Sequence, residues 1–203
     1  MRRLPLFPLP IVLFPGAVTS LHVFEPRYRE MVKNAFESDG CFGIVFQEVE
    51  RSDDFRLEEG SVGTLAVIEK SRPLSDGGSL ILVRGDARFA IVDGIESDTP
   101  YDEALVDVYE DEAGVQREAL MVRRYDTLQL FNGVVKCLSG ACGECPQFDV
   151  NREFAFQLAP TIQIDPVWQQ SLLELRDEGD RLERLDAVLQ AALEQQQEED
   201  GAN

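Results

Sequence analysis

The segment LPLFPLPIVLFPGAVTSLHVFEPRYREMV, residues 4–32, contains the features that decide the N-terminal fold. Its prolines and the Pro15-Gly16 pair separate three short apolar runs: Leu4–Leu9, Ile11–Phe14 and Leu21–Phe24. Proline has no backbone N–H and fixes φ, so the segment predicts edge strands joined by rigid corners, not a helix or a central strand. The Pro15-Gly16 pair predicts a type II turn, in which the glycine takes the positive φ.

A helix is predicted to follow at Pro26, because proline in the first helical position loses no hydrogen bond. Apolar residues then recur at helical spacing, which predicts one buried face. That face comprises Tyr28, Met31, Val32, Ala35 and Phe36. Gly40 supplies a stop signal for this helix.

Further strands are predicted where β-forming residues gather between turn signals. They span Phe42–Val49, Ser61–Glu69, Ser79–Val92 and Tyr101–Tyr109. The sequence Asp-Gly-Gly at 76–78 predicts a hairpin, and Gly85 predicts a bulge or sharp bend within its strand. Five or six strands with one inserted helix indicate a small closed or half-closed barrel.

From Asp111 onward the apolar pattern changes to helical spacing. Asp165-Pro166 predicts an N-cap followed by the first helical residue. The predicted helices span Val115–Phe131, Asn151–Leu158, Val167–Leu175 and Asp180–Gln197. The first is expected to bury Ala119, Met121, Val122, Tyr125 and Leu128, and the last a seam of Leu182, Leu185, Leu189 and Ala192.

Three motifs resemble the Lon protease N-terminal (substrate-binding) domain family. Residues 4–32 are similar to the family's opening progression of PLFPL, LFPG and LHxFEPRY. VRGDARFAI at 83–91 is similar to its strand with the RG-x-x-RF pattern, and WQQSLLELRDEGDRLERLDAVLQ at 168–190 to a helical segment. The resemblance therefore spans nearly the whole chain, in the family's order.

This resemblance implies an α+β protein in two parts. Residues 1–112 would form a PUA-like β pseudobarrel with one inserted helix, and residues 113–203 an α-helical bundle with a frayed acidic tail. It also implies binding of polypeptide segments, unfolded or with exposed apolar residues. The function predicted first is therefore a non-catalytic recognition module or adaptor.

The motifs of ATP-driven proteolysis are not found in this sequence. No GxxxxGK[ST] phosphate loop occurs, and the lysines Lys33, Lys70 and Lys136 lie outside any peptidase-like context for a Ser–Lys dyad. His22, the single histidine, lies in an apolar run and is expected to be structural. We therefore predict no enzyme, no catalytic residue and no cofactor, in a free-standing family member without ATPase or peptidase domains.

The charge of the chain argues against nucleic acid as a partner. The formal net charge is −19, with 11 basic and 22 acidic residues up to Glu112 and 8 basic and 16 acidic residues beyond it. Such a surface repels phosphate backbones, which require clustered Lys and Arg. The apolar runs are far shorter than the ~20 residues of a membrane span, and no signal peptide is evident, so a cytoplasmic protein without membrane contact is expected.

Three cysteines offer an alternative function. Cys137, Cys142 and Cys145 form a C-x4-C-x2-C pattern in a glycine-rich stretch, while Cys41 lies apart. Such thiols can bind a metal or form a redox disulfide, but a structural zinc site needs four ligands and no fourth is evident nearby. We predict no metal, and retain a thiol- or metal-dependent regulatory protein as the alternative.

The sequence does not assign binding residues or an oligomeric state. Four aromatic residues, Phe7, Phe14, Phe24 and Tyr28, can line an apolar groove for a polypeptide, but packing in the core explains them equally well. The location of the binding surface therefore depends on which of them are exposed.

Overall fold

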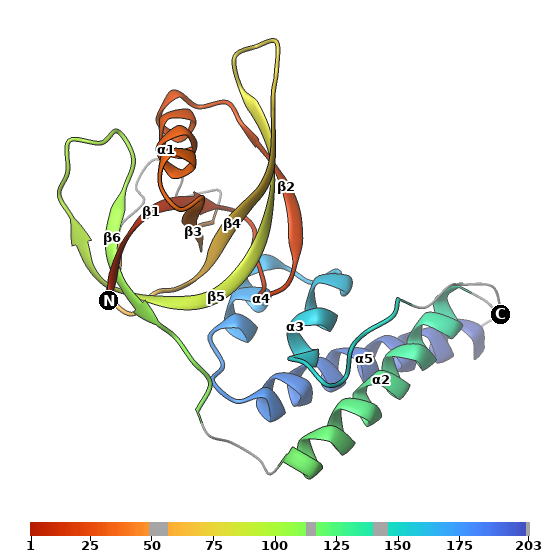
Figure 1. Cartoon of the computed structure of the whole chain (residues 1–203). Coiled ribbons are helices and arrows are strands. Elements are labelled where there is room, and N and C mark those ends of the chain that lie inside the picture. Colours follow the sequence, from red (N-terminus) through yellow and green to blue (C-terminus); the bar gives the residue numbers. More distant parts are fainter. Residues whose placement is uncertain (49–56, 113–116, 140–145, 202–203) are drawn as a thin grey trace. The chain divides into compact units, whose positions relative to one another are not determined.

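The strands of this chain form one mixed sheet that closes on itself (Figure 1). The structure, a computed structural model, describes residues 1–48, 57–112, 117–139 and 146–201. Within these residues the strand order is β2-β5-β4-β3-β1-β6, and β6 also pairs with β5. The strands are β1 (Arg2–Leu9), β2 (Val18–Val23), β3 (Cys41–Phe46), β4 (Val62–Pro73), β5 (Ser79–Ile95) and β6 (Glu103–Val108).

The chain divides into two compact units that interleave along the sequence. Unit 1 comprises residues 1–110 and 163–174, and unit 2 comprises residues 111–162 and 175–203. Unit 1 contains the sheet with α1 (Pro26–Glu37) and α4 (Pro166–Leu173). Unit 2 contains α2 (Arg117–Ser139), α3 (Phe154–Leu158), a short 3-10 helix (Ala159–Thr161) and α5 (Glu178–Gly201). Mixed sheet and helices together confirm the α+β class.

Helix α4 belongs to unit 1 through contacts far apart in sequence. The guanidinium of Arg88 donates to the carbonyl oxygen of Leu173 at 2.6 Å. The Gln170 side chain donates to the carbonyl oxygen of Val62 at 2.9 Å. Asp165 caps this helix by accepting from the backbone N–H of Trp168 at 3.0 Å, which confirms the predicted N-cap. Because α4 groups with the sheet, the chain passes from one unit to the other three times, after residues 110, 162 and 174.

Strand β1 lies between β3 and β6, so the prediction of an edge strand is wrong. Its first half, Arg2–Pro5, pairs antiparallel with β6, and its second half, Leu6–Leu9, pairs parallel with β3. Because each half has a neighbour on only one side, the missing N–H groups of its prolines are tolerated. The run Ile11–Phe14 forms no strand and leads into the turn.

The turn and the hairpin follow the sequence signals. Gly16 has φ 80° and the backbone N–H of Ala17 donates to Phe14 at 3.0 Å, as a type II turn requires. Gly77, with φ 81°, lies in the hairpin that joins β4 to β5. At Gly85 the register of β4 and β5 shifts, and an added Cβ would collide with the carbonyl oxygen of Phe14. The predicted bulge is confirmed.

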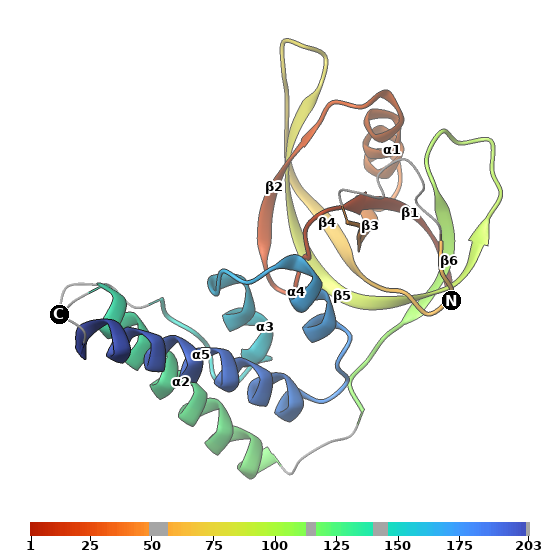
Figure 2. The ribbon, with the colours of Figure 1, turned by 180° about the vertical axis from the view of Figure 1, so that it is seen from behind.

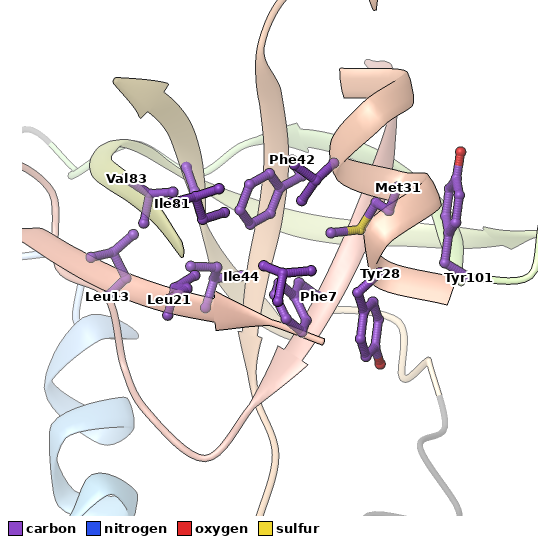
Figure 3. Close-up of a cluster of buried hydrophobic side chains, with 13 residues drawn as sticks. Phe7, Leu13, Leu21, Tyr28, Met31, Phe42, Ile44, Ile81, Val83 and Tyr101 are labelled. Carbon is purple, nitrogen blue, oxygen red and sulfur yellow. The ribbon is translucent and has the colours of Figure 1, made fainter. Parts of the chain in front are cut away.

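Helix α1 closes the core of unit 1 with its apolar face (Figure 3). Met31 and Tyr28 point from this helix toward Phe7 and Phe42 of the sheet. The ring centroids of Phe7 and Tyr28 are 4.2 Å apart. The predicted buried face is confirmed except at Phe36, which is half exposed although the neighbouring Ala35 is buried.

Unit 2 is built around the long helices α2 and α5, seen side by side in both views (Figures 1 and 2). Leu182, Leu185 and Leu189 of α5 are buried as predicted. The predicted stripe of α2 is wrong, because Val122 and Tyr125 are exposed. The face that is buried instead comprises Arg124, Thr127, Phe131 and Val134.

Candidate functional site

The aromatic residues proposed to line a groove are mostly part of the core. Phe7, Phe14 and Tyr28 are each at most 5% exposed and cannot contact a partner without unfolding. Phe24 differs, because 62% of it is exposed. Phe24 directly follows β2, and it is the only one of these four aromatic residues whose side chain is exposed at the surface of unit 1.

Strand β2 forms one edge of the sheet. Among the described strands it pairs with β5 alone, over the register from Val18 opposite Arg84 to Val23 opposite Ser79. Figures 1 and 2 show β2 at the rim of unit 1, with β5 on its inner side. A strand with one neighbour leaves half of its backbone N–H and C=O groups without a strand partner.

The hydrogen bonds of Gly85 show which backbone groups of β2 face away from the sheet. Gly85 donates to Ala17 and accepts from Gly16, both at 2.9 Å, so its polar groups point toward the β2 side. Opposed residues in an antiparallel pair alternate between bonded and non-bonded pairs. The next pair, Arg84 with Val18, is therefore non-bonded, and the N–H and C=O of Val18 point outward.

By the same alternation, Ser20 and His22 also direct their backbone groups to the outer edge. Val18, Ser20 and His22 are exposed, whereas Leu21 and Val23 face the core. The outer edge of β2 thus offers three N–H donors and three C=O acceptors in a row. We call Val18–Phe24, with these outward groups, the β2 edge.

The side chains beside the β2 edge are apolar or already paired. The His22 and Phe24 rings lie 5.5 Å apart, and His22 Nε2 lies 3.6 Å from the carboxylate of Asp76. The sequence predicted a structural His22 within an apolar run, and the structure places its side chain half exposed at the surface. Leu80 and Leu82, opposite His22 and Ser20, are half-buried and continue the apolar surface on β5.

The charged residues that flank the β2 edge form ion pairs. Arg84, opposite Val18, contacts Glu69 at 3.1 Å and Asp86 at 3.3 Å. At the other end, Arg27 contacts Glu25 at 3.0 Å. With no charged residue in β2 itself, the edge is locally neutral within a chain of net charge −19.

The groups with shifted pKa values do not form a reactive centre. Burial raises the pKa of the Cys41 thiol, which disfavours the nucleophilic thiolate. Burial likewise raises the pKa of Tyr28 in the core. A hydrogen bond from Arg3 lowers the pKa of Glu103, and this pair joins β1 to β6.

The cysteine stretch of the alternative function lies mainly outside the described residues. Cys142 and Cys145 are not described, and Cys137 at the end of α2 is a free, exposed thiol. Within the described ranges no group of three His, Cys, Asp or Glu side chains converges on a possible metal position. None of the described helices is long and apolar enough to cross a membrane.

The sequence predicted edge strands within residues 4–32, and β2, which contains most of the run Leu21–Phe24, lies at an edge as predicted. The sequence did not assign binding residues to this edge, although a signal was present. The strand VTSLHV contains no proline and no charged residue, in a chain where 28% of the residues are charged. Such a segment predicts an uncharged strand, and the register with β5 then shows which of its backbone groups face outward.

Comparison with known proteins places the chain in a family. The "Lon protease 2" of Herpetosiphon aurantiacus is 34% identical over 197 residues, which cover 92% of this chain and 23% of that protein. The "Lon protease" of Xanthomonas oryzae pv. oryzae is 30% identical over 200 residues, covering 96% and 23%. The chain thus spans less than a quarter of the length of these relatives.

Two solved structures share the fold. A Lon N-terminal domain protein from Xanthomonas campestris has a TM-score of 0.67 at 24% identity, covering 92% of this chain and 98% of that one. The N-terminal domain of a Mycobacterium avium complex Lon protease has a TM-score of 0.71 at 18% identity, covering 93% and 98%. The family described as the ATP-dependent protease La (LON) substrate-binding domain matches residues 3–191, and the chain belongs to this family.

Proposed function

We propose that this chain binds polypeptide segments as a substrate-recognition module or adaptor. The observation that carries this proposal is the match of residues 3–191 to a substrate-binding domain family. That match covers both units, so the recognition role is proposed for the chain as a whole. We infer no proteolytic role from it, because the matched family describes substrate binding.

The surface of unit 1 supports this proposal. Polypeptide recognition needs exposed apolar contacts together with backbone hydrogen-bonding groups that a partner chain can satisfy. The β2 edge combines both, since Phe24 is exposed beside three outward N–H and three outward C=O groups. No other described edge of the sheet combines these two properties without charged residues.

We also infer that the sheet is a pseudobarrel of the PUA-like kind, followed by a helical bundle in two domains divided near residue 112. Support comes from the ring β5-β4-β3-β1-β6, which the β5–β6 pairing closes. Residues 163–174 group with unit 1, so in this division α4 would pack with the pseudobarrel although it follows residue 112 in the sequence.

Binding to a permanently unfolded protein tests the proposed function. Fluorescently labelled lysozyme, reduced and alkylated so that it stays unfolded, is titrated with the full chain and followed by anisotropy. We expect saturable binding, and no binding to the same lysozyme in its folded state. Equal binding to both forms, or none to the unfolded form up to tens of micromolar, would contradict the proposal.

A further inference from the structure

Unit 1 contains a second open edge, which provides an internal comparison for β2. Strand β4 pairs with β3 only up to Val67, opposite Cys41. Beyond that point, its segment Lys70–Pro73 pairs with β5 and has no strand partner on its other side among the described residues. Lys70–Pro73 and the β2 edge thus each have a strand partner on one side only among the described residues.

The edge at Lys70–Pro73 carries the features by which proteins prevent edge-to-edge pairing. It contains Lys70, Arg72 and Pro73, and a register shift separates it from Ile68. Charged side chains, proline and bulges at an edge all hinder the addition of another strand. This edge is protected.

The β2 edge has none of these features. VTSLHV contains no charged residue and no proline, and its register with β5 runs from Val18 to Val23 without a shift. An open, regular and uncharged edge is a template for pairing with another chain. A chain that protects one edge and leaves the other open retains the open edge for a partner.

The charges around the β2 edge restrict what that partner is. The flanking arginines are paired with carboxylates, so a partner segment needs no charge of its own where it contacts the strand. The net charge of −19 repels acidic segments and also a second copy of this chain. An uncharged stretch with basic flanks fits both conditions.

We propose that the β2 edge takes up an extended polypeptide segment as an added strand, which deepens and rests on the proposed polypeptide-binding function. The segment is uncharged, rich in β-branched or apolar residues, and basic at its ends. Its backbone pairs with the outward groups of Val18, Ser20 and His22, and one face of its side chains lies beside Phe24.

Proline substitution at matched serines tests this mode of binding. Ser20→Pro removes an outward N–H of β2 and leaves the hydrogen bonds to β5 in place. Ser71→Pro does the same on the protected edge, because Ser71 lies opposite Ile81, whose backbone groups face β2. The probe is a short peptide of alternating valine and threonine with lysine at both ends. We expect its affinity to fall about tenfold or more in Ser20→Pro.

The Ser71→Pro variant is expected to bind as the unaltered chain does, and thermal melts followed by Trp168 fluorescence show whether both variants are folded. Equal affinity in all three proteins would overturn strand addition. Should Ser20→Pro fail to fold, amide hydrogen exchange of the unaltered chain decides. Peptide must then protect the amides of Val18, Ser20 and His22, and unchanged exchange at these amides would overturn the proposal.

Two controls separate this inference from the proposed function. Binding of unfolded lysozyme without protection of the β2 amides would support the proposed function and overturn the proposal of strand addition. A concentration-dependent dimer of the chain alone, with the same amides protected, would show that a second copy occupies the edge and overturn the proposal. The same peptide with glutamate at both ends is expected to bind at least several-fold more weakly, an effect that salt reduces.

Discussion

Unit 1 and unit 2 bury charge in different ways. In unit 1 the Arg3–Glu103 pair leaves its arginine 53% exposed and lies at the border of the sheet. In unit 2 the Arg124–Glu178 pair has both side chains at most 10% exposed. Unit 1 also buries Arg88, which donates to the backbone carbonyl of Leu173, whereas unit 2 buries a guanidinium together with its carboxylate partner.

A second arginine gives the same result for unit 2. Arg181 of α5 is fully buried, donates to the Asp111 carboxylate at 2.8 Å and lies 4.2 Å from the centroid of the Phe156 ring. A buried charge that loses its partner is strongly destabilising. The difference between the units predicts that loss of one carboxylate damages unit 2 more than loss of one apolar side chain damages unit 1.

The largest effect is expected for Glu178→Ala. Glu178 accepts from Arg124 at 3.1 Å and from the backbone N–H of Phe154 at 2.8 Å. Its removal leaves a buried guanidinium and a helix start without their acceptor, at a cost of about 4 kcal/mol. Chemical denaturation followed by far-UV circular dichroism measures this loss, because α2 and α5 supply most of the helix.

The matched control is Glu183→Ala, which removes an exposed carboxylate from the same helix. We expect it to change the free energy of unfolding by less than about 0.5 kcal/mol. A similar loss in both variants would mean that net charge, and not the buried pair, determines the stability of unit 2.

The second effect, about 3 kcal/mol, is expected for Met31→Ala in unit 1. Met31 of α1 is fully buried in the cluster of Figure 3, and its truncation leaves a cavity. Trp168, the single tryptophan, lies in unit 1 and reports its unfolding. Phe36→Ala, on the same helix but half exposed, serves as control with an expected loss below about 1 kcal/mol. Equal losses would contradict the assigned core face.

The two units also differ in how much of their structure the sequence predicts. In unit 1, alternation, proline and glycine signals predicted α1, the turn at Gly16 and the β4–β5 hairpin, because these depend on neighbouring residues. The position of β1 was missed, since two half-strands with different partners look like one edge strand. The edge position of β2 agrees with the edge strands predicted for residues 4–32, but the backbone groups that it directs outward depend on its register with β5, which a local pattern does not contain.

In unit 2 the apolar pattern of α2 pointed to the wrong face. Val122 and Tyr125 are apolar but exposed, whereas Arg124 is buried because Glu178, far along the chain, neutralises it. A periodicity analysis that assigns arginine to solvent cannot find such a face. The grouping of α4 with the sheet was missed for a similar reason, as it depends on Arg88 and Gln170.

A third, smaller effect of about 1 kcal/mol is expected at Glu103. The hydrogen bond from Arg3 lowers the pKa of Glu103, so the folded state binds its proton less tightly than the unfolded state. This contribution is fully present above the unfolded pKa and is lost as the pH falls through the folded pKa. Glu103→Gln should lower stability at neutral pH and remove this part of the acid dependence, measured by Trp168 fluorescence. A variant with unchanged acid dependence would contradict this assignment.

The smallest effect has the opposite sign and lies in unit 2. Burial raises the pKa of Asp186 on α5, and its Oδ1 atom has no hydrogen-bond partner among the described residues. Because the folded state holds this proton more tightly, stability falls as the pH rises from the unfolded pKa to the folded pKa, and the cost persists above it. Asp186→Asn should therefore stabilise unit 2 at neutral pH by about 0.5 kcal/mol and flatten its profile between those two pKa values. Chemical denaturation, monitored by circular dichroism below the unfolded pKa and above the folded pKa, measures this difference in the free energy of unfolding. Destabilisation at neutral pH would show that the Asp186 carboxylate has a favourable partner in the folded state, and would contradict this assignment.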